Sequence, residues 1–136
     1  MTLLELGNGF SFVGNQYRLE IDNKDYFIDL LFYHTKLHCY IVVELKNTEF
    51  KPEFAGKMNF YLSAVDDLVK SDYDNPTIGL LLVKEKSKLS VEYALRDINK
   101  PIGVSTYHLT KYLPKNFVDN LPTEDELNLH IDIDDI

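Results

Sequence analysis

The stretch YFIDLLFYHTKLHCYIVVELK, Tyr26 to Lys46, decides the fold because it contains two long apolar runs joined by a short polar connection. Both runs are rich in β-branched and aromatic residues, and their nearly continuous apolar character predicts central strands covered on both faces. A connection this short favours antiparallel pairing. Each run nevertheless carries ionised residues, Asp29 in the first and Glu44 and Lys46 in the second. Because a charge buried without a partner is costly, these three residues need an explanation.

The remaining sequence alternates strand and helix patterns around these runs, with no repeat or linker that divides the chain. Polar and apolar residues alternate in QYRLEI, which is typical of a strand with one covered face. Pro52 suits the first turn of a helix, and apolar residues follow it at helical spacing. The predicted elements are a helix at Met1–Leu6, strands at Gln16–Ile21, Tyr26–Tyr33 and Cys39–Lys46, a helix from Pro52 to about Lys70, a strand at Thr77–Glu85, a helix in VEYALRDI (91–98) and a strand in VSTYHL (104–109).

The composition is that of a folded domain. A chain of 136 residues with 45% hydrophobic residues is long enough and apolar enough to bury one core, which excludes a disordered protein. No stretch approaches the roughly 20 apolar residues of a membrane span, and no secretory signal pattern is present. The single cysteine, Cys39, forms no intrachain disulfide, which suits a reducing compartment. We therefore expect a cytoplasmic location and no membrane partner.

The net charge of -8 is unevenly distributed along the chain. Residues 119–136 hold seven acids and neither lysine nor arginine, which leaves 15 acids and 14 bases in residues 1–118. The nearly neutral body therefore does not exclude a nucleic-acid partner. We predict one domain over residues 1–122 and a solvated acidic C-terminal tail over residues 123–136, with one or two helical turns after Pro122.

The spacing of the three ionised residues predicts a metal site. Glu44 and Lys46 leave the same face of a strand, and antiparallel pairing in a suitable register places Asp29 beside Glu44. Two adjacent carboxylates repel until one is protonated, whereas a divalent cation removes the conflict. Mg²⁺, with Mn²⁺ as an alternative, is usually held by one or two carboxylates, water and substrate phosphate. Lys46 would then orient a water molecule or stabilise charge on a phosphate.

Two simpler interpretations of these residues remain open. Asp29 can be a strand residue whose carboxylate accepts backbone hydrogen bonds. Glu44 and Lys46 can be an exposed pair at the end of a strand, which contributes little to stability.

The spacing of Asp29 and the triplet Glu44-Leu45-Lys46 resembles the PD-(D/E)XK nuclease motif, and the order of elements is similar to the restriction-endonuclease-like αβββαβ core. The phrases GFSFVGNQYRLE, DYFIDLLFYH, VVELKNTEFKPEFAGKMNFYLSAVDD and YALRDINKPIGVSTY resemble the C-terminal nuclease domain of bacterial YhcG-type proteins. The short motif occurs by chance, while the long phrases are more specific. The resemblance implies an α/β (α+β) fold with a mixed central sheet flanked by helices. It also implies an N-terminal helical domain in full-length relatives.

The resemblance also implies roles for individual residues. Asp29 and Glu44 would bind the metal, with the carbonyl of Leu45 as a further ligand, and Lys46 would be the catalytic lysine. Many members carry a glutamine and a tyrosine on the following helix, where this sequence has Lys57 and Tyr61. A further acid often lies in the first helix, and its candidate here is Glu5.

Other polar residues give weaker predictions. Gln16, Arg18 and Glu20 share one face of the first strand. Three interpretations stay open: Gln16 or Glu20 joins the active site, Gln16 and Arg18 contact nucleic acid, or this face is a solvated edge. Lys84 and Lys86 belong to a basic stripe after the fourth strand, which either contacts a nucleic-acid backbone or forms a solvated turn. Lys57 is a further candidate for contact with phosphate.

A zinc site is not favoured. His34 and His38 flank a predicted turn between strands rather than sharing a helix face, and with Cys39 they form a poor ligand set. We expect both histidines at the surface and Cys39 as a small buried hydrophobic residue.

The sequence therefore predicts a metal-dependent hydrolase of phosphodiester bonds in nucleic acid, and we favour a DNA endonuclease. The alternative is a nucleic-acid-binding or protein-assembly module on a nuclease fold that cleaves little or not at all. Paired cuts in duplex DNA favour a homodimer. DNA versus RNA, cleavage specificity and the number of metal ions are not determined by the sequence.

Overall fold

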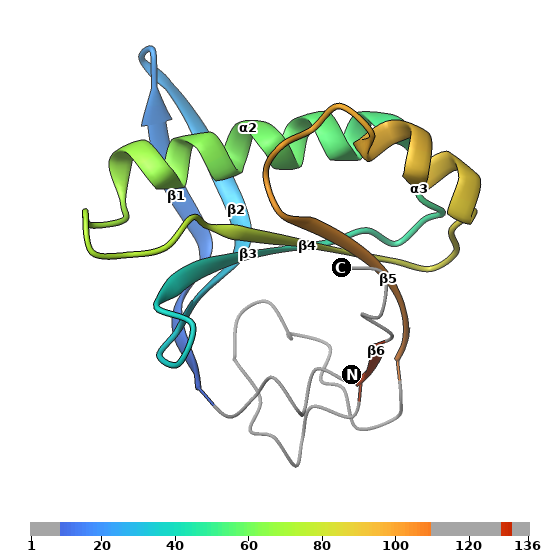
Figure 1. The fold of residues 1–136 in the computed structure, drawn as a ribbon, viewed down its shortest axis with the longest axis horizontal. Coiled ribbons are helices and arrows are strands. Elements are labelled where there is room, and N and C mark those ends of the chain that lie inside the picture. Colours follow the sequence, from blue (N-terminus) through green and yellow to red (C-terminus); the bar gives the residue numbers. More distant parts are fainter. Residues whose placement is uncertain (1–8, 110–128, 132–136) are drawn as a thin grey trace.

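A mixed sheet in sequence order forms the centre of the molecule (Figure 1). The computed structural model describes residues 9–109 and 129–131. Its elements are β1 (Phe10–Ile21), β2 (Lys24–His34), β3 (Cys39–Leu45), α2 (Pro52–Leu68), β4 (Ile78–Val83), α3 (Lys88–Leu95), β5 (Ile102–Leu109) and β6 (Leu129–Ile131). The pairs β3–β4 and β4–β5 are parallel, and the other three neighbouring pairs are antiparallel. The predicted α+β fold with a mixed sheet is confirmed.

Both described helices lie on the same face of the sheet. α2 connects β3 to its parallel neighbour β4, and α3 connects β4 to β5, so the chain makes two successive crossovers in the same direction (Figure 1). Because such crossovers are almost always right-handed, successive ones place their helices on one side. α2 thereby covers the strands that carry Asp29 and Glu44.

Several elements differ from the sequence prediction. β1 begins at Phe10 rather than Gln16 and contains an irregularity between Phe12 and Gly14. α3 begins before the predicted helix, because Ser87 caps it by accepting a hydrogen bond from the backbone N–H of Ser90. Residues 129–131, in the predicted acidic tail, pair with β5 as the unpredicted strand β6. The predicted first helix, Glu5 and the predicted helical turns after Pro122 lie outside the described residues.

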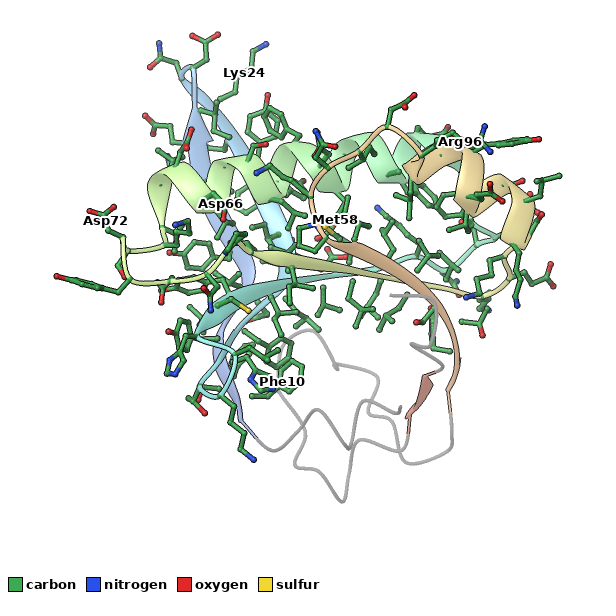
Figure 2. The ribbon with its side chains drawn as sticks, in the orientation of Figure 1. Phe10, Lys24, Met58, Asp66, Asp72 and Arg96 are labelled. Carbon is green, nitrogen blue, oxygen red and sulfur yellow. The ribbon has the colours of Figure 1, made fainter. Side chains whose placement is uncertain are left out.

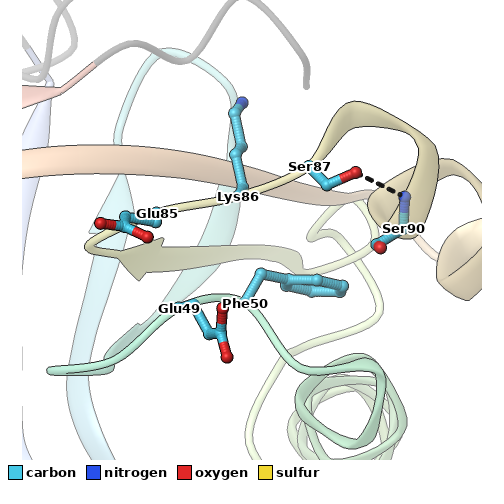
Figure 3. A pocket seen from close by; sticks show the side chains of 6 residues that line it. All are labelled: Glu49, Phe50, Glu85, Lys86, Ser87 and Ser90. Carbon is cyan, nitrogen blue, oxygen red and sulfur yellow. Dashed lines mark hydrogen bonds between the residues drawn. The ribbon is translucent and has the colours of Figure 1, made fainter.

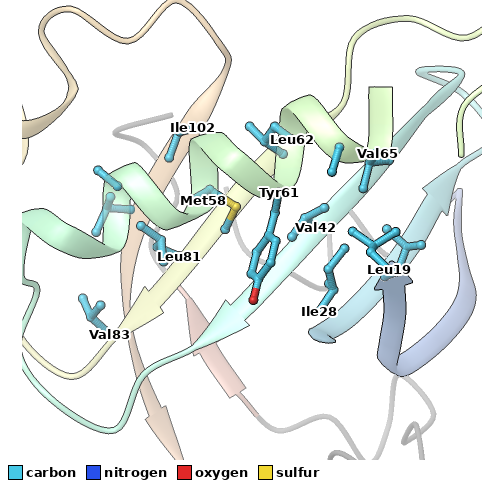
Figure 4. Close-up of a cluster of buried hydrophobic side chains, with 14 of the residues drawn as sticks. Leu19, Ile28, Val42, Met58, Tyr61, Leu62, Val65, Leu81, Val83 and Ile102 are labelled. Carbon is cyan, nitrogen blue, oxygen red and sulfur yellow. The ribbon is translucent and has the colours of Figure 1, made fainter. Parts of the chain in front are cut away.

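The core occupies both faces of the central strands. On the face under α2, Met58, Leu62 and Val65 pack with strand residues that include Val42 and Leu81 (Figure 4). The other face carries a second cluster, which contains Leu30, Cys39, Ile41, Val43, Leu80, Leu82 and Tyr107. β3 thus contributes alternately to both clusters, as its nearly continuous apolar sequence predicts.

α2 packs closely against β4 at Gly79. A Cβ atom at Gly79 would lie 2.7 Å from Met58, so the absence of a side chain at this position allows the helix to pack there. A larger residue at position 79 would therefore push Met58 and Leu62 of α2 away from β4.

The β1–β2 hairpin leaves the sheet near the middle of β2. β2 pairs with β1 along nearly its whole length, but with β3 only from Leu30 to His34. The free part of the hairpin projects past α2, with Lys24 labelled near its tip (Figure 2). Its turn residues Asp22 and Asn23 both have positive φ, which suits a two-residue hairpin turn. Asp29 is therefore the first residue of β2 beyond the paired region with β3.

Two minor predictions on the connection between β2 and β3 can be compared with the structure. His38 is exposed and Cys39 is buried, as predicted. The predicted surface position of His34 is wrong: the residue is 5% exposed, its ring packs against Phe10 of β1, and its Nδ1 accepts a hydrogen bond from the Leu37 N–H. The longer β1 is the reason, because it covers the end of β2.

Within the described part of the chain, no helix is long and apolar enough to cross a bilayer.

Candidate active site

Where β2 and β3 diverge, the carboxylates of Asp29 and Glu44 take the place of backbone carbonyls as hydrogen-bond acceptors. Glu44 Oε2 accepts a hydrogen bond from the Asp29 N–H at 2.8 Å, and Asp29 Oδ2 accepts one from the Leu45 N–H at 3.1 Å. In a continuing antiparallel ladder, backbone carbonyls would be the acceptors. The two side chains thus interlock across the gap, and the structure brings together the pair singled out in the sequence. One of the simpler interpretations, an Asp29 carboxylate that accepts a backbone hydrogen bond, is also observed.

Glu44 is a buried acid in an unfavourable electrostatic environment. Its residue is 3% exposed, and burial, followed by the charge of Asp29, raises its pKa to about 7. The hydrogen bond from the Asp29 N–H and the charges of Lys46 and Lys57 oppose this shift only in part. Near neutral pH the pair therefore carries negative charge that the surrounding residues do not fully compensate.

The Asp29 carboxylate also contacts β1. Gln16 Nε2 donates a hydrogen bond to Asp29 Oδ1 at 3.2 Å, and the φ of Gln16 is +45°. Both oxygens of Asp29 thus accept a hydrogen bond, one from each neighbouring strand. Gln16 belongs to the carboxylate site in this geometry.

α2 contributes Lys57 and Tyr61 above the same region. Tyr61 is 2% exposed and reaches from the helix toward the sheet (Figure 4). Its hydroxyl donates to the Phe27 carbonyl at 3.2 Å, and burial raises its pKa. This hydroxyl therefore bonds to the edge of β2 in the part of the strand that is not paired with β3. Lys57 is exposed, and its Nζ lies 5.6 Å from the centroid of the Tyr61 ring.

Lys46 follows β3 and is held by three elements. Its backbone N–H donates to the Leu82 carbonyl of β4 at 2.8 Å, and its carbonyl accepts from the Tyr107 hydroxyl of β5 at 3.3 Å. Its Nζ lies 5.1 Å from the ring centroid of Phe54, in the first turn of α2, which is a cation–π distance. Sequence reasoning missed this contact, since helical spacing assigns Phe54 only to the apolar face of the helix.

The other predicted site residues take part in different contacts. Arg18 is more than half exposed and forms ion pairs with Glu20 at 2.7 Å and Asp25 at 2.8 Å. Lys84 is exposed. Lys86 Nζ donates to the Val104 carbonyl at 2.9 Å. The contacts that Arg18 and Lys86 make here are with groups outside the carboxylate pair.

A separate cavity of about 250 Å³ lies beside the start of α3 (Figure 3). Its lining residues are Glu49, Phe50, Glu85, Lys86, Ser87 and Ser90. The cavity includes neither Asp29 nor Glu44, and the Nζ of its lysine is bonded to a backbone carbonyl. It is therefore not part of the carboxylate site.

The donor set at the carboxylate pair fits a hard divalent cation. Among the described residues, no group of three or more His, Cys, Asp and Glu side chains is placed to hold a metal ion. Two carboxylates suffice for Mg²⁺, which retains several waters and takes further ligands from substrate phosphate. A cation between Asp29 and Glu44 would also offset the charge that raises the pKa of Glu44.

Two solved structures resemble the fold. A structure of an EndoMS–dsDNA2 complex superposes with a TM-score of 0.52 at 13% sequence identity, covering 73% of this chain and 37% of that chain. The crystal structure of a protein of unknown function gives a TM-score of 0.51 at 11% identity, covering 75% of this chain and 53% of that chain. At these identities the likeness concerns the fold alone.

Sequence comparison identifies the family. The chain is 39% identical over 119 residues to the Escherichia coli (strain K12) protein named "Putative nuclease YhcG", which covers 88% of this chain. The match covers 32% of that relative, so the chain spans about a third of its length. The family model for the YhcG PDDEXK nuclease domain matches residues 1–122. The chain therefore belongs to the YhcG PDDEXK nuclease domain family.

Proposed function

We propose that this domain is a divalent-metal-dependent DNA endonuclease that hydrolyses phosphodiester bonds. The observation that carries the proposal is the interlocked pair Asp29 and Glu44, with its buried and incompletely compensated negative charge. Membership of a nuclease family supports the reaction class. The EndoMS fold, solved in a complex with double-stranded DNA, supports DNA as the substrate.

Each residue of the site has a proposed role. Asp29 and Glu44, with the carbonyl of Leu45, hold Mg²⁺ or Mn²⁺, and the bound cation supplies Lewis-acid stabilisation of charge on the phosphate. Lys46 provides a fixed positive charge that orients the attacking water or stabilises the developing charge on phosphate oxygens. Tyr61 fixes the backbone of β2 two residues before Asp29, through its bond to the Phe27 carbonyl.

Exposed bases extend the proposed site toward the nucleic acid. Lys57 is exposed on α2, and its charge acts on Glu44, so it lies where it can meet a phosphate. Contacts to nucleic acid from Arg18, Lys84 and Lys86 stay predictions. Paired cuts in the two strands of a duplex favour two active sites, so the proposal includes a homodimer on DNA.

The proposal is tested by incubating the purified domain with supercoiled, linear and single-stranded DNA in Mg²⁺, Mn²⁺ or EDTA. We expect nicked or linear products from supercoiled DNA with a divalent cation and none in EDTA. Glu44→Gln should abolish most of the cleavage. Asp67→Asn, which removes an exposed acid of α2, is the matched control and should cleave like the wild type.

Two results would count against the nuclease. Cleavage that persists in EDTA would remove metal dependence from the proposal. DNA binding in a gel-shift assay without cleavage under any cation would favour the alternative, a binding module on a nuclease fold.

A further inference from the structure

The backbone of Gln16 adopts a conformation that is unusual inside a strand. Its φ is +45°, in the left-handed region that non-glycine residues rarely occupy. The other non-glycine residues with positive φ in the described chain, Asp22, Asn23 and His38, lie at turns between strands. Gln16 instead lies within β1, between two residues that both pair with β2. Strained backbone of this kind persists only where surrounding contacts hold it, and it is enriched at functional sites.

The register places Gln16 opposite Asp29. Asn15 pairs with Leu30 and Tyr17 pairs with Ile28, so the unpaired residues between them face each other. The alternation of β2 also slips here, since Ile28 and Leu31 both belong to the core under α2. Both strands are therefore irregular at the same position.

This irregularity brings the Gln16 amide to the Asp29 carboxylate. Gln16 Nε2 donates to Oδ1 at 3.2 Å, while the Leu45 N–H donates to Oδ2 at 3.1 Å. A carboxylate held at both oxygens cannot rotate freely, yet each oxygen retains a lone pair for a cation. Polar groups that orient a metal ligand in this way typically change metal affinity by about 10–100-fold when they are removed.

We propose that Gln16 is a positioning residue, whose strained backbone is retained because it directs the side-chain amide to orient Asp29 for a divalent cation. This inference rests on the proposed metal-dependent function. Of the roles considered from the sequence, it favours a place for Gln16 beside the carboxylates over direct contact with nucleic acid, and it names what the side chain does there.

The test uses Gln16→Ala and Gln16→Gly, with Mn²⁺ titrated by calorimetry in the absence of nucleic acid. Both variants lose the amide and should bind Mn²⁺ about 10–100-fold more weakly. In EDTA, Gln16→Gly should melt a few degrees above Gln16→Ala, because only glycine tolerates this φ without strain. At an ordinary strand position the order is reversed.

His38 provides a matched control, since it also has positive φ (+53°) and is exposed at the turn between β2 and β3. His38→Gly should likewise melt above His38→Ala, but both should bind Mn²⁺ like the wild type. Wild-type affinity in the Gln16 variants, or an equal loss in the His38 variants, would overturn the positioning role alone. A wild-type domain that binds no Mn²⁺ would overturn the metal-dependent function and this inference together.

Discussion

Glu44→Gln should stabilise the domain in the absence of metal, and the gain should grow with pH. Burial and the charge of Asp29 raise the pKa of Glu44 from its ordinary value of 4.5 to about 7. Between these values the folded state binds more protons than the unfolded state, so stability falls as the pH rises through this window. The amide removes this loss while retaining an oxygen that can accept the hydrogen bond of the Asp29 N–H.

The magnitude follows from the size of the pKa difference. Each pKa unit corresponds to about 1.4 kcal/mol, which gives a full penalty of about 3 kcal/mol at pH 8. At pH 5 most of the penalty is absent, because Glu44 is protonated in the folded state. The difference between mutant and wild type should therefore change by about 2–3 kcal/mol between pH 5 and pH 8, or roughly 10 °C in melting temperature for a domain of this size. Any constant cost of burying the amide cancels in this comparison.

The assay is urea denaturation of both proteins at pH 5 and pH 8 in EDTA, followed by circular dichroism. Asp67→Asn, an exposed acid of the same domain, controls for general effects of charge and should show no such pH-dependent gain. The reasoning is refuted if Glu44→Gln changes stability by the same amount at both pH values, since Glu44 would then carry no electrostatic cost.

Three further predictions concern the same site. Lys46→Met should abolish most cleavage but leave the Mn²⁺ affinity within about twofold of the wild type, because the ammonium is proposed to act on water or phosphate. Calorimetry checks this, and a loss of Mn²⁺ affinity as large as that of Glu44→Gln would contradict the division of roles. Phe54→Leu removes the aromatic ring under the Lys46 ammonium, so it should lower kcat and change KM little, and Phe54→Tyr should restore kcat. If Phe54→Leu has the kinetics of the wild type, the 5.1 Å contact does not matter for catalysis. For a site of about 1 mM affinity, roughly 10 mM Mg²⁺ should add about 1.4 kcal/mol of stability, or roughly 3–6 °C, beyond a monovalent salt of equal ionic strength. Asp29→Asn should raise stability in EDTA and shrink this Mg²⁺ increment, and an undiminished increment would exclude Asp29 from a metal site.

The elements that carry the site could be predicted because their sequence signals are local. The apolar runs of β2 and β3 specify buried strands, and the apolar spacing after Pro52 specifies α2. The two-residue spacing of Glu44 and Lys46 places both on the face under the helix. Short-range periodicity therefore predicted which strands carry the two carboxylates and which face Glu44 and Lys46 share, but not how Asp29 meets Glu44.

Other features of the site depend on contacts between distant segments. The β2–β3 ladder ends at the pair Leu30 and Val43, where the two strands diverge. Local periodicity does not predict at which residue two paired strands separate. The contact of Lys46 with Phe54 requires α2 to begin over the end of β3. β6 was missed because its three residues lie in a segment whose acidic composition indicates a solvated tail.

The charges inside YFIDLLFYHTKLHCYIVVELK are explained by the end of a strand pair. Where β3 leaves β2, the backbone groups of Phe27, Asp29 and Leu45 lose their ladder partners, and buried polar groups without partners are costly. The side chains of Tyr61, Glu44 and Asp29 satisfy them in turn. A neutral acceptor would satisfy the same groups without raising any pKa. Satisfying these backbone groups therefore does not require ionised side chains. The negative charge that the two carboxylates add is what a divalent cation would bind.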